Sequence, residues 1–561
     1  MADKSKETVQ KLQFLHSLKQ PCVRRTVYSR YPMIKKTLLF IFHAHVPYIR
    51  HEDENEPLEA TQLYEMLSYG FLPFLRMCSC LDAAIVPFKC AFVISPLLCE
   101  MLKSPLCQKR YSAYLDRHIV FAQQELKRAT GTPREALVRR YLEFLTLNRE
   151  DFHTRYKKDI LSGINFFADK GYIELLATSA TPCFFPFYQD MPEALTMQIE
   201  QGLSSFREDF AAVPAGFWLP SMGYDTGLDS IIKSYGLDYT VLESQSFLFA
   251  DHPPVNGIFS AAMGESGLSF LGKDSAACAD IVHPETGFYL HPDYLDTDKD
   301  VGFELDEETL SPLFDVKKGR RTTGFCYHRR GGGDYDAAAG ALQAEKDAER
   351  FIANRDAVLT EAAELLDTDS GPLCSVSVLP LRFLGKTWME GMWWLEAVFR
   401  KLAQRHDMQC VLPAEYLKKV RRIQSINPFY ASNLPSGYAD ELINSSNDWM
   451  FPRIQKATER MIDLAGRFPD DQGFKERMLN MAAKELLLAQ SMDWPLMADA
   501  QISAEYAAAE CEEHLDAFTD VYDSLGSGSI GTDRLIKREK EYPIFSDMNY
   551  RFYGGTIKSS S

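Results

Sequence analysis

Short apolar runs that alternate with longer helical patterns place the strongest constraint on what this chain can fold into. The runs are continuous rather than alternating, which is typical of parallel strands covered on both faces. Helical patterns such as Ser112–Lys127, Glu193–Phe210 and Gln343–Glu361 separate most of them. This order predicts an α/β fold, either an α/β barrel or a doubly wound sheet, and the pattern alone does not separate the two. The predicted strands are Thr37–Phe42, Cys90–Ile94, Tyr172–Ala177, Gly216–Leu219, Tyr239–Leu242, Gly324–Tyr327, Cys374–Leu379 and Cys410–Leu412.

After about residue 420 the strand signal stops and only helical periodicity remains. Apolar residues at helical spacing mark one face of each predicted helix. The patterns are Ile454–Leu464, Met478–Gln490 and Ala504–Leu525, with Gly526 as a predicted stop. The C-terminal part of the chain is therefore predicted to be an all-α module.

Composition excludes several functional classes. The 561 residues carry a formal net charge of −17, which argues against nucleic acid, because phosphate binding needs clustered Lys and Arg. No stretch approaches the roughly eighteen apolar residues of a membrane span. The twelve cysteines include no CxxC pair, so we expect buried thiols in a reducing compartment. No secretory signal pattern is present either, and we expect a cytoplasmic protein.

The first 32 residues are basic and weakly patterned, and Met33 stands just before the first predicted strand. We hypothesise that translation starts at Met33, or that residues 1–35 form a tail. The intact mass of the native protein tests this hypothesis.

Functional residues of α/β barrels lie at the C-terminal ends of the strands. His43 and His45, two residues apart after the first strand, point the same way and can bind a metal or a sugar hydroxyl. A metal needs a third ligand, and the sequence offers no clear one, so we predict no metal and no cofactor. Trp218 at a later strand end can stack on a sugar ring or belong to the core. Trp388 lies in a Trp-dense stretch, and Asp493 ends an element of the helical module.

These segments carry a resemblance to glycoside hydrolase family 57 of the α-glucan branching enzyme type. The family patterns are HAHxPYxRH, ELLxxxAT, WLPE and GHWWxEG, followed by segments of the helical module. They are matched, in order, by His43–His51, Glu174–Thr181, Trp218–Pro220, the set Gly385, Trp388, Glu390 and Gly391, and then Asn447–Trp449, Ala483–Gln490 and Asp493–Pro495. The resemblance implies a (β/α)7 barrel over residues 36–421, a helical domain over 422–530, and a tail over 531–561. It also implies α-glucan as ligand, with His43, His45, Trp218, Trp388 and Asp493 as binding residues.

The resemblance implies a retaining mechanism as well, with two carboxylates roughly 5 Å apart. The nucleophile position falls on Ser221 and the acid/base position on Pro380. A serine hydroxyl is a poor nucleophile without an adjacent base, and proline carries no proton to transfer. Four further family positions are also replaced, by Pro182, Leu295, Lys386 and Ser436.

The favoured hypothesis is therefore a catalytically inactive relative that binds an α-glucan or a protein partner of unknown kind. The alternative is an active branching enzyme or α-glucanotransferase with relocated carboxylates. Asp225, four residues beyond Ser221, is one candidate for such a relocation. Glu390 matches a carboxylate position of the family and is not a replacement. A relocated pair would catalyse the reaction only if both carboxylates were placed to within a fraction of an ångström of the required positions.

Overall fold

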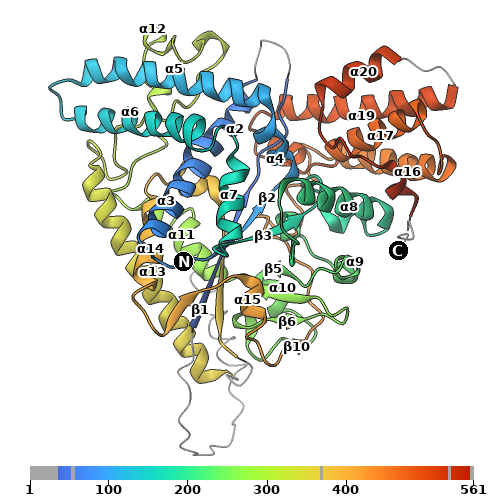
Figure 1. The fold of residues 1–561 in the computed structure, drawn as a ribbon, viewed down its shortest axis with the longest axis horizontal. Coiled ribbons are helices and arrows are strands. Elements are labelled where there is room, and N and C mark those ends of the chain that lie inside the picture. Colours follow the sequence, from blue (N-terminus) through green and yellow to red (C-terminus); the bar gives the residue numbers. More distant parts are fainter. Residues whose placement is uncertain (1–35, 52–56, 367–370, 528–531, 556–561) are drawn as a thin grey trace, which may run out of the picture.

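Seven parallel strands form a curled sheet in the order β7–β5–β4–β3–β2–β1–β8 (Figure 1). The computed structural model describes residues 36–51, 57–366, 371–527 and 532–555. A short β6 is antiparallel to β7, β10 pairs with β6, and β9 pairs with β1. The strands are β1 Lys36–Ala44, β2 Cys90–Ile94, β3 Ile173–Thr178, β4 Gly216–Trp218, β5 Tyr239–Leu242, β6 Ala262–Met263, β7 Ser269–Gly272, β8 Cys374–Pro380, β9 Met408–Cys410 and β10 Gln424–Ser425.

The sheet curls until its two outer parallel strands meet. Lys273, directly after β7, forms a parallel bridge with Val376 of β8, and the Asp274 N–H donates to the Val376 carbonyl at 2.9 Å. The Asp274 carboxylate accepts from Ser375 at 2.6 Å and from Arg355 at 2.7 Å. The sequence left a barrel and a doubly wound sheet open, and this closure together with the surrounding helices confirms the α/β barrel.

The strands read as continuous apolar runs because both of their faces are buried. Leu39 and Ile41 of β1 pack inside the curl with Val93, Leu176 and Trp218. The alternate residues of β1 pack against the outer helices and belong to the main core. Successive side chains of a strand point to opposite faces, so a strand covered on both sides has no polar face.

Helices cover the outside of the curled sheet and fill the long connections (Figure 1). The α5–α6 hairpin lies in the connection between β2 and β3, and α13 packs on α14 beside β8. The helices of this part are α2 Thr61–Glu65, α3 Leu72–Ala83, α4 Pro96–Lys103, α5 Pro105–Ala129, α6 Glu135–Glu150, α7 Ile160–Asp169, α8 Pro192–Asp209, α9 Leu228–Ser234, α10 Ser244–Leu248, α11 Ser275–Val282, α12 Glu307–Leu310, α13 Ala337–Leu365, α14 Gly391–Leu402 and α15 Pro413–Leu417.

The predicted C-terminal helical module is present and packs beside α8 (Figure 1). It consists of α16 Met450–Arg467, α17 Phe474–Ala489, α18 Asp493–Asp499, α19 Ala504–Ser527 and α20 Thr532–Glu541. The predicted tail from residue 531 needs correction, because α20 and the buried Tyr550 and Tyr553 belong to this module. Residues 1–35, including Met33, lie outside the described residues.

The strand prediction missed β6, β7 and β10, placed β9 two residues too late, and assigned a strand to one segment that the structure shows as a loop. Ser269–Gly272, which forms β7, was not predicted, since its apolar run is only two residues long. Gly324–Tyr327 is not a strand, although Phe325, Cys326 and Tyr327 are buried. Its apolar character comes from packing under α5 and α6, where the Phe325 ring lies 5.0 Å from both Phe121 and Tyr141.

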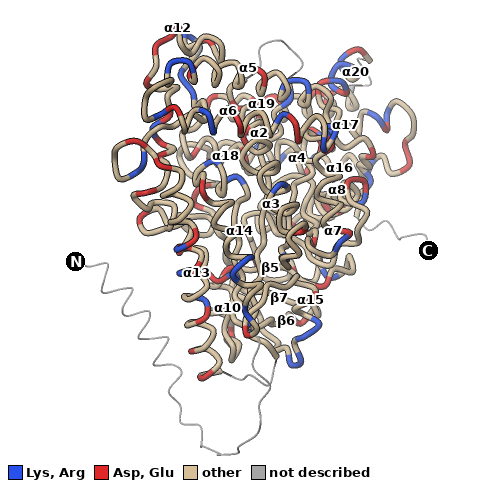
Figure 2. The backbone as a smooth tube through the Cα atoms, turned by 60° about the vertical axis from the view of Figure 1, so that its left-hand side comes forward, with Lys and Arg blue, Asp and Glu red and all other residues tan. Residues whose placement is uncertain are grey.

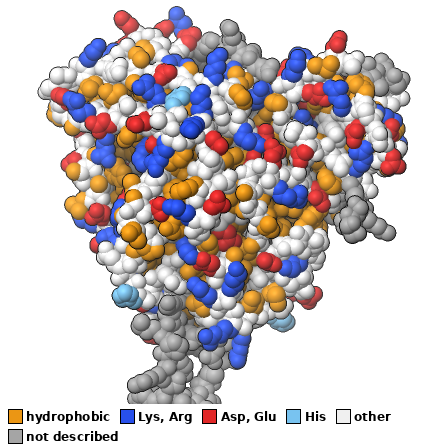
Figure 3. Space-filling model, viewed as in Figure 1, with side chains coloured by type: hydrophobic (Ala, Val, Ile, Leu, Met, Phe, Trp, Pro, Cys, Tyr) orange, Lys and Arg blue, Asp and Glu red, His pale blue; other side chains and the backbone are white. Residues whose placement is uncertain are grey.

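Charged residues lie mainly on the helices and loops (Figure 2). On the face shown in Figure 3, basic and acidic side chains are interspersed. Among the described helices, none has both the length and the apolar character needed to cross a membrane.

A buried ion cluster ties α20 to the rest of the helical module. Glu485 of α17 is fully buried and accepts from Arg538 at 2.8 Å on each oxygen and from His514 at 2.7 Å. Burial alone raises the pKa of Glu485, but these donors outweigh it and hold the pKa at about 2. A buried carboxylate with three such contacts is sensitive to the loss of any partner.

Glu485→Gln should therefore destabilise the protein by about 3–5 kcal/mol, because the substitution removes the fully buried charge that Arg538 and His514 contact. Arg538 keeps Glu513 and Glu541, whose side chains are 50% and 30% exposed. Urea unfolding measures this change in free energy. Glu512→Gln is the matched control, since Glu512 pairs with Arg453 on the surface, with side chains 55% and 43% exposed. Its effect should stay within about 1 kcal/mol. Equal effects of the two substitutions would contradict the assignment.

Lowering the pH should remove the stabilisation that the Glu485 carboxylate contributes. The folded-state pKa of Glu485 is lowered from its ordinary 4.5 to about 2, so its stabilisation is fully present above pH 4.5. It is lost as the pH falls through that window. Thermal unfolding of the wild type across this range should show a drop in Tm that Glu485→Gln reduces. A drop of the same size in both proteins would exclude Glu485 as its source.

Candidate functional site

His43 and Trp218 meet at the C-terminal ends of β1 and β4. Their rings stack with centroids 5.8 Å apart and an interplanar angle of 18°. Burial, together with the nearby His45 and Lys273, lowers the pKa of His43 to about 4. His43 is therefore neutral near pH 7, where its imidazole can donate one hydrogen bond and accept another.

An ion pair that the sequence did not suggest lies beside these rings. Glu243 follows β5 and Lys273 follows β7, and the Lys273 Nζ lies 2.5 Å from the Glu243 Oε1. Their side chains are 8% and 17% exposed. Glu243 also accepts from Ser275 at 3.4 Å. The Glu243 carboxylate is thus held by an ammonium group.

Ser221 lies in a tight turn just after β4. Its φ is 49° and that of Met222 is 50°, so two successive non-glycine residues adopt the left-handed conformation. Backbone bonds fix the turn, from Met222 to Leu219 at 2.8 Å and from Asn433 to the Ser221 carbonyl at 2.8 Å. A strained backbone conformation of this kind persists only where surrounding contacts hold it in place, and it often occurs in functional turns.

Pro380 is the last residue of β8 and pairs in register with His43 of β1. Neither β4 nor β8 therefore ends in a carboxylate. Asp225 accepts from the Thr226 N–H at 2.7 Å, and Tyr438 approaches its other oxygen at 3.5 Å. The carboxylate of Asp225 is engaged in its own turn and by a residue of the segment that leads to the helical module.

His45 joins the barrel to the helical module. Its Nδ1 lies 2.8 Å from the Ser95 Oγ, and its Nε2 lies 2.8 Å from the Asp493 Oδ1. The second oxygen of Asp493 accepts from Ser491 at 2.7 Å. Asp493, predicted to bind substrate, is therefore occupied by contacts within the protein.

Ser95, His45 and Asp493 have the composition of a hydrolase triad but not its geometry. Ser95 is 7% exposed, and its hydroxyl accepts from the Leu98 N–H as the N-cap of α4. The next residue, Pro96, has no N–H to stabilise an oxyanion. This row of side chains positions the two domains and caps a helix.

Trp388 and Glu390 lie in the core rather than at a strand end. Trp388 is 1% exposed, with its ring 5.4 Å from Tyr294 and 5.5 Å from Trp394. It offers no ring face to a ligand in this structure. Glu390 is fully buried, which raises its pKa, and it accepts from the Leu295 N–H at 3.0 Å.

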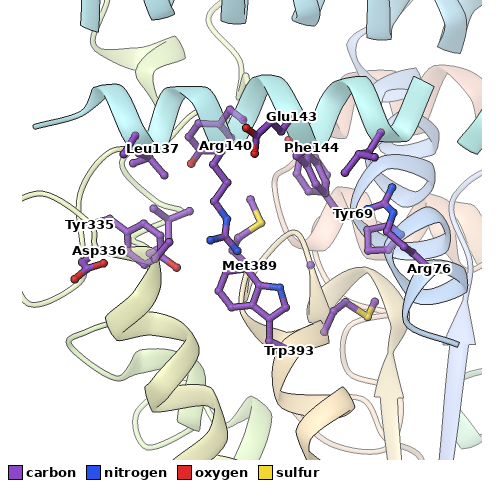
Figure 4. Close-up of a pocket in the computed structure, with 18 of the residues that line it drawn as sticks. Tyr69, Arg76, Leu137, Arg140, Glu143, Phe144, Tyr335, Asp336, Met389 and Trp393 are labelled. Carbon is purple, nitrogen blue, oxygen red and sulfur yellow. The ribbon is translucent and has the colours of Figure 1, made fainter. Parts of the chain in front are cut away.

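A large cavity of about 820 Å³ lies elsewhere, between α3, α6, α14 and the segment 334–337 (Figure 4). No strand residue lines it. Arg140 reaches down from α6 over the Trp393 ring, 4.3 Å from its centroid. Leu295, which the sequence resemblance assigns to the position of an arginine, lines this cavity. The cavity is thus separate from the cluster formed by His43 and Trp218.

Sequence reasoning placed His43, His45, Trp218, Ser221 and Pro380 at strand ends, where the structure has them. It missed Glu243, Lys273 and Ser95. A Ser-Pro pair opening a helix was the available signal for Ser95, whereas the other two sit in short runs without a motif. No group of three or more His, Cys, Asp or Glu suited to a metal occurs in the part of the chain that the structure describes.

Comparison with known families identifies two regions of the chain. Residues 39–290 match the model of glycosyl hydrolase family 57. Residues 453–553 match the C-terminal domain of 1,4-α-glucan branching enzymes. The second match ends within the segment first predicted to be a tail and agrees with the folded α20.

Proteins of similar sequence and structure include α-glucan branching enzymes and an α-amylase. A 1,4-α-glucan branching enzyme of Thermococcus kodakarensis is 23% identical over 500 residues, 84% of this chain and 71% of that protein. An α-amylase structure from Thermotoga maritima superposes with a TM-score of 0.86 at 27% identity, covering 93% of this chain and all of that one. A branching enzyme from Pyrococcus horikoshii gives 0.82 at 20% identity over 93% and 97%. The chain is thus similar to glycoside hydrolase family 57 over residues 39–290, and to 1,4-α-glucan branching enzymes of that family over residues 453–553.

Proposed function

We propose that this protein binds α-glucan at the C-terminal end of its barrel without cleaving or transferring it. The binding surface is formed by the neutral His43 imidazole and the Glu243–Lys273 pair, while the Trp218 ring, 6% exposed, stacks on His43 from the core. These groups offer donors and acceptors for sugar hydroxyls beside an apolar ring. One solved relative carries glucose, which supports a sugar as the ligand.

The observation that carries the proposal is the chemistry of the two strand ends. A retaining mechanism needs a nucleophilic carboxylate and a second carboxyl group roughly 5 Å away. Ser221 and Pro380 occupy the corresponding positions. The carboxylate of Asp225 is bound within its turn, so a replacement pair is not assembled there.

The second candidate function is α-glucan branching or transfer, which the names of the relatives favour. Glu243 is the observation on its side, since it is a carboxylate at the end of β5 near His43. It is held in an ion pair with Lys273 at 2.5 Å. This candidate function also requires a second carboxyl group, roughly 5 Å from Glu243, to act as the general acid.

Prolonged incubation with amylose and with maltoheptaose separates the two candidates. We expect no new branches and no change of chain length, measured by chromatography of the products. Glu243→Gln and Asp225→Ala serve as matched variants. Products formed by the wild type and abolished in either variant would establish catalysis and reject our proposal.

Trp218→Ala should weaken maltoheptaose binding at least tenfold, about 1.4 kcal/mol, because the buried indole that stacks on His43 and holds the imidazole in place is lost. Calorimetry on the full chain measures the affinity. Trp218→Phe keeps a ring and should retain most of the binding. Unchanged affinity in Trp218→Ala would place the sugar elsewhere.

The cytoplasmic location expected from the cysteines stays a prediction.

A further inference from the structure

Three exposed aromatic side chains lie in contact at the surface. The Phe249 ring lies 5.8 Å from that of Phe429, and Phe429 stacks on Tyr430 at 4.2 Å with an interplanar angle of 27°. Phe249 is 62% exposed, Phe429 38% and Tyr430 47%. Single exposed apolar residues are common, but a contiguous set of rings marks an interaction site.

Backbone contacts fix these rings next to the strand-end site. The Phe429 N–H donates to the Ser246 carbonyl of α10 at 3.0 Å, and α10 follows β5 directly (Figure 1). Ala431 forms an antiparallel bridge with Tyr224, three residues beyond Ser221. The row of rings therefore begins beside the turn that holds Ser221.

A further ring continues the row toward that turn. Tyr430 lies 5.0 Å from Tyr438, whose hydroxyl donates to the Tyr224 carbonyl at 3.2 Å. The surface is thus held by two segments distant in sequence, one after β5 and one before the helical module. Such double anchoring keeps the rings in place without a bound ligand, which lowers the cost of binding.

The charges beside the rings indicate a neutral ligand. Asp251 accepts from Asn427 at 3.2 Å, two residues before Phe429, and Asp225 lies at the Tyr438 end. Two carboxylates flanking the row disfavour phosphates and other anions. A sugar chain suits this surface, because its apolar C–H faces pack on rings while its hydroxyls reach the polar groups beside them.

We propose that Phe249, Phe429 and Tyr430 form an outer platform for an α-glucan chain that extends from the barrel end. This assignment rests on the proposed function. It requires that a long glucan reaches both His43 at the barrel end and the platform, whereas a short glucan bound at the barrel end reaches only His43.

Calorimetry with maltoheptaose and maltotriose on the full chain tests the platform. The double variant Phe429→Ala/Tyr430→Ala should bind maltoheptaose at least tenfold more weakly than the wild type and maltotriose within twofold. Phe166→Ala is the matched control, because Phe166 is 52% exposed on α7, which leads into the opposite end of β3. This control should bind both sugars like the wild type.

Phe429→Tyr/Tyr430→Phe keeps both rings and should restore maltoheptaose binding, which separates ring loss from misfolding. If the wild type binds maltoheptaose and the double alanine variant binds it equally well, the platform is rejected and the proposed function stands. If the wild type binds neither sugar at millimolar concentration, the proposed function fails and the platform fails with it.

Discussion

The contact that closes the curled sheet determines where every candidate residue lies. Asp274 is buried two residues after the end of β7. It forms hydrogen bonds with Val376 and Ser375 of β8 and with Arg355 of α13, and so joins β7 to β8. Arg355 is 3% exposed, and a pair buried this deeply is costly to break. Because parallel strands then end at one edge, His43, Trp218 and Lys273 come together from three strands. His43 also pairs in register with Pro380 of the neighbouring strand β8.

The contacts that stabilise the scaffold do not involve the side chains of Ser221 and Pro380. Pro380 ends β8, where a missing N–H forfeits at most one ladder bond. Ser221 sits in a left-handed turn held by backbone bonds to Leu219 and Asn433, and these bonds do not depend on its side chain. The His45–Asp493 contact and the Glu485 cluster secure the helical module. Fold and chemistry are thus carried by different residues, and the first does not guarantee the second.

Much of this architecture could be predicted from sequence, because strands buried on both faces leave continuous apolar runs. The strand ends, and with them His43, His45 and Trp218, followed from that pattern. β7 was missed because a two-residue apolar run carries no periodicity, while Gly324–Tyr327 resembled a strand through burial under α5 and α6. Glu243 and Lys273 could not be paired from sequence, since their contact depends on the curl of the sheet. The core position of Trp388 could not be predicted either, because a Trp-dense stretch does not show which rings face inward.

The central claim is that the barrel end binds α-glucan without the two-carboxylate chemistry of a retaining enzyme. A crystal structure of the full chain after prolonged soaking with maltoheptaose tests it most directly. The account predicts an intact oligosaccharide at the barrel end beside His43, with no covalent bond to the protein. A glucosyl unit bonded to Glu243 or Asp225, or a shortened or branched product in the site, would contradict it.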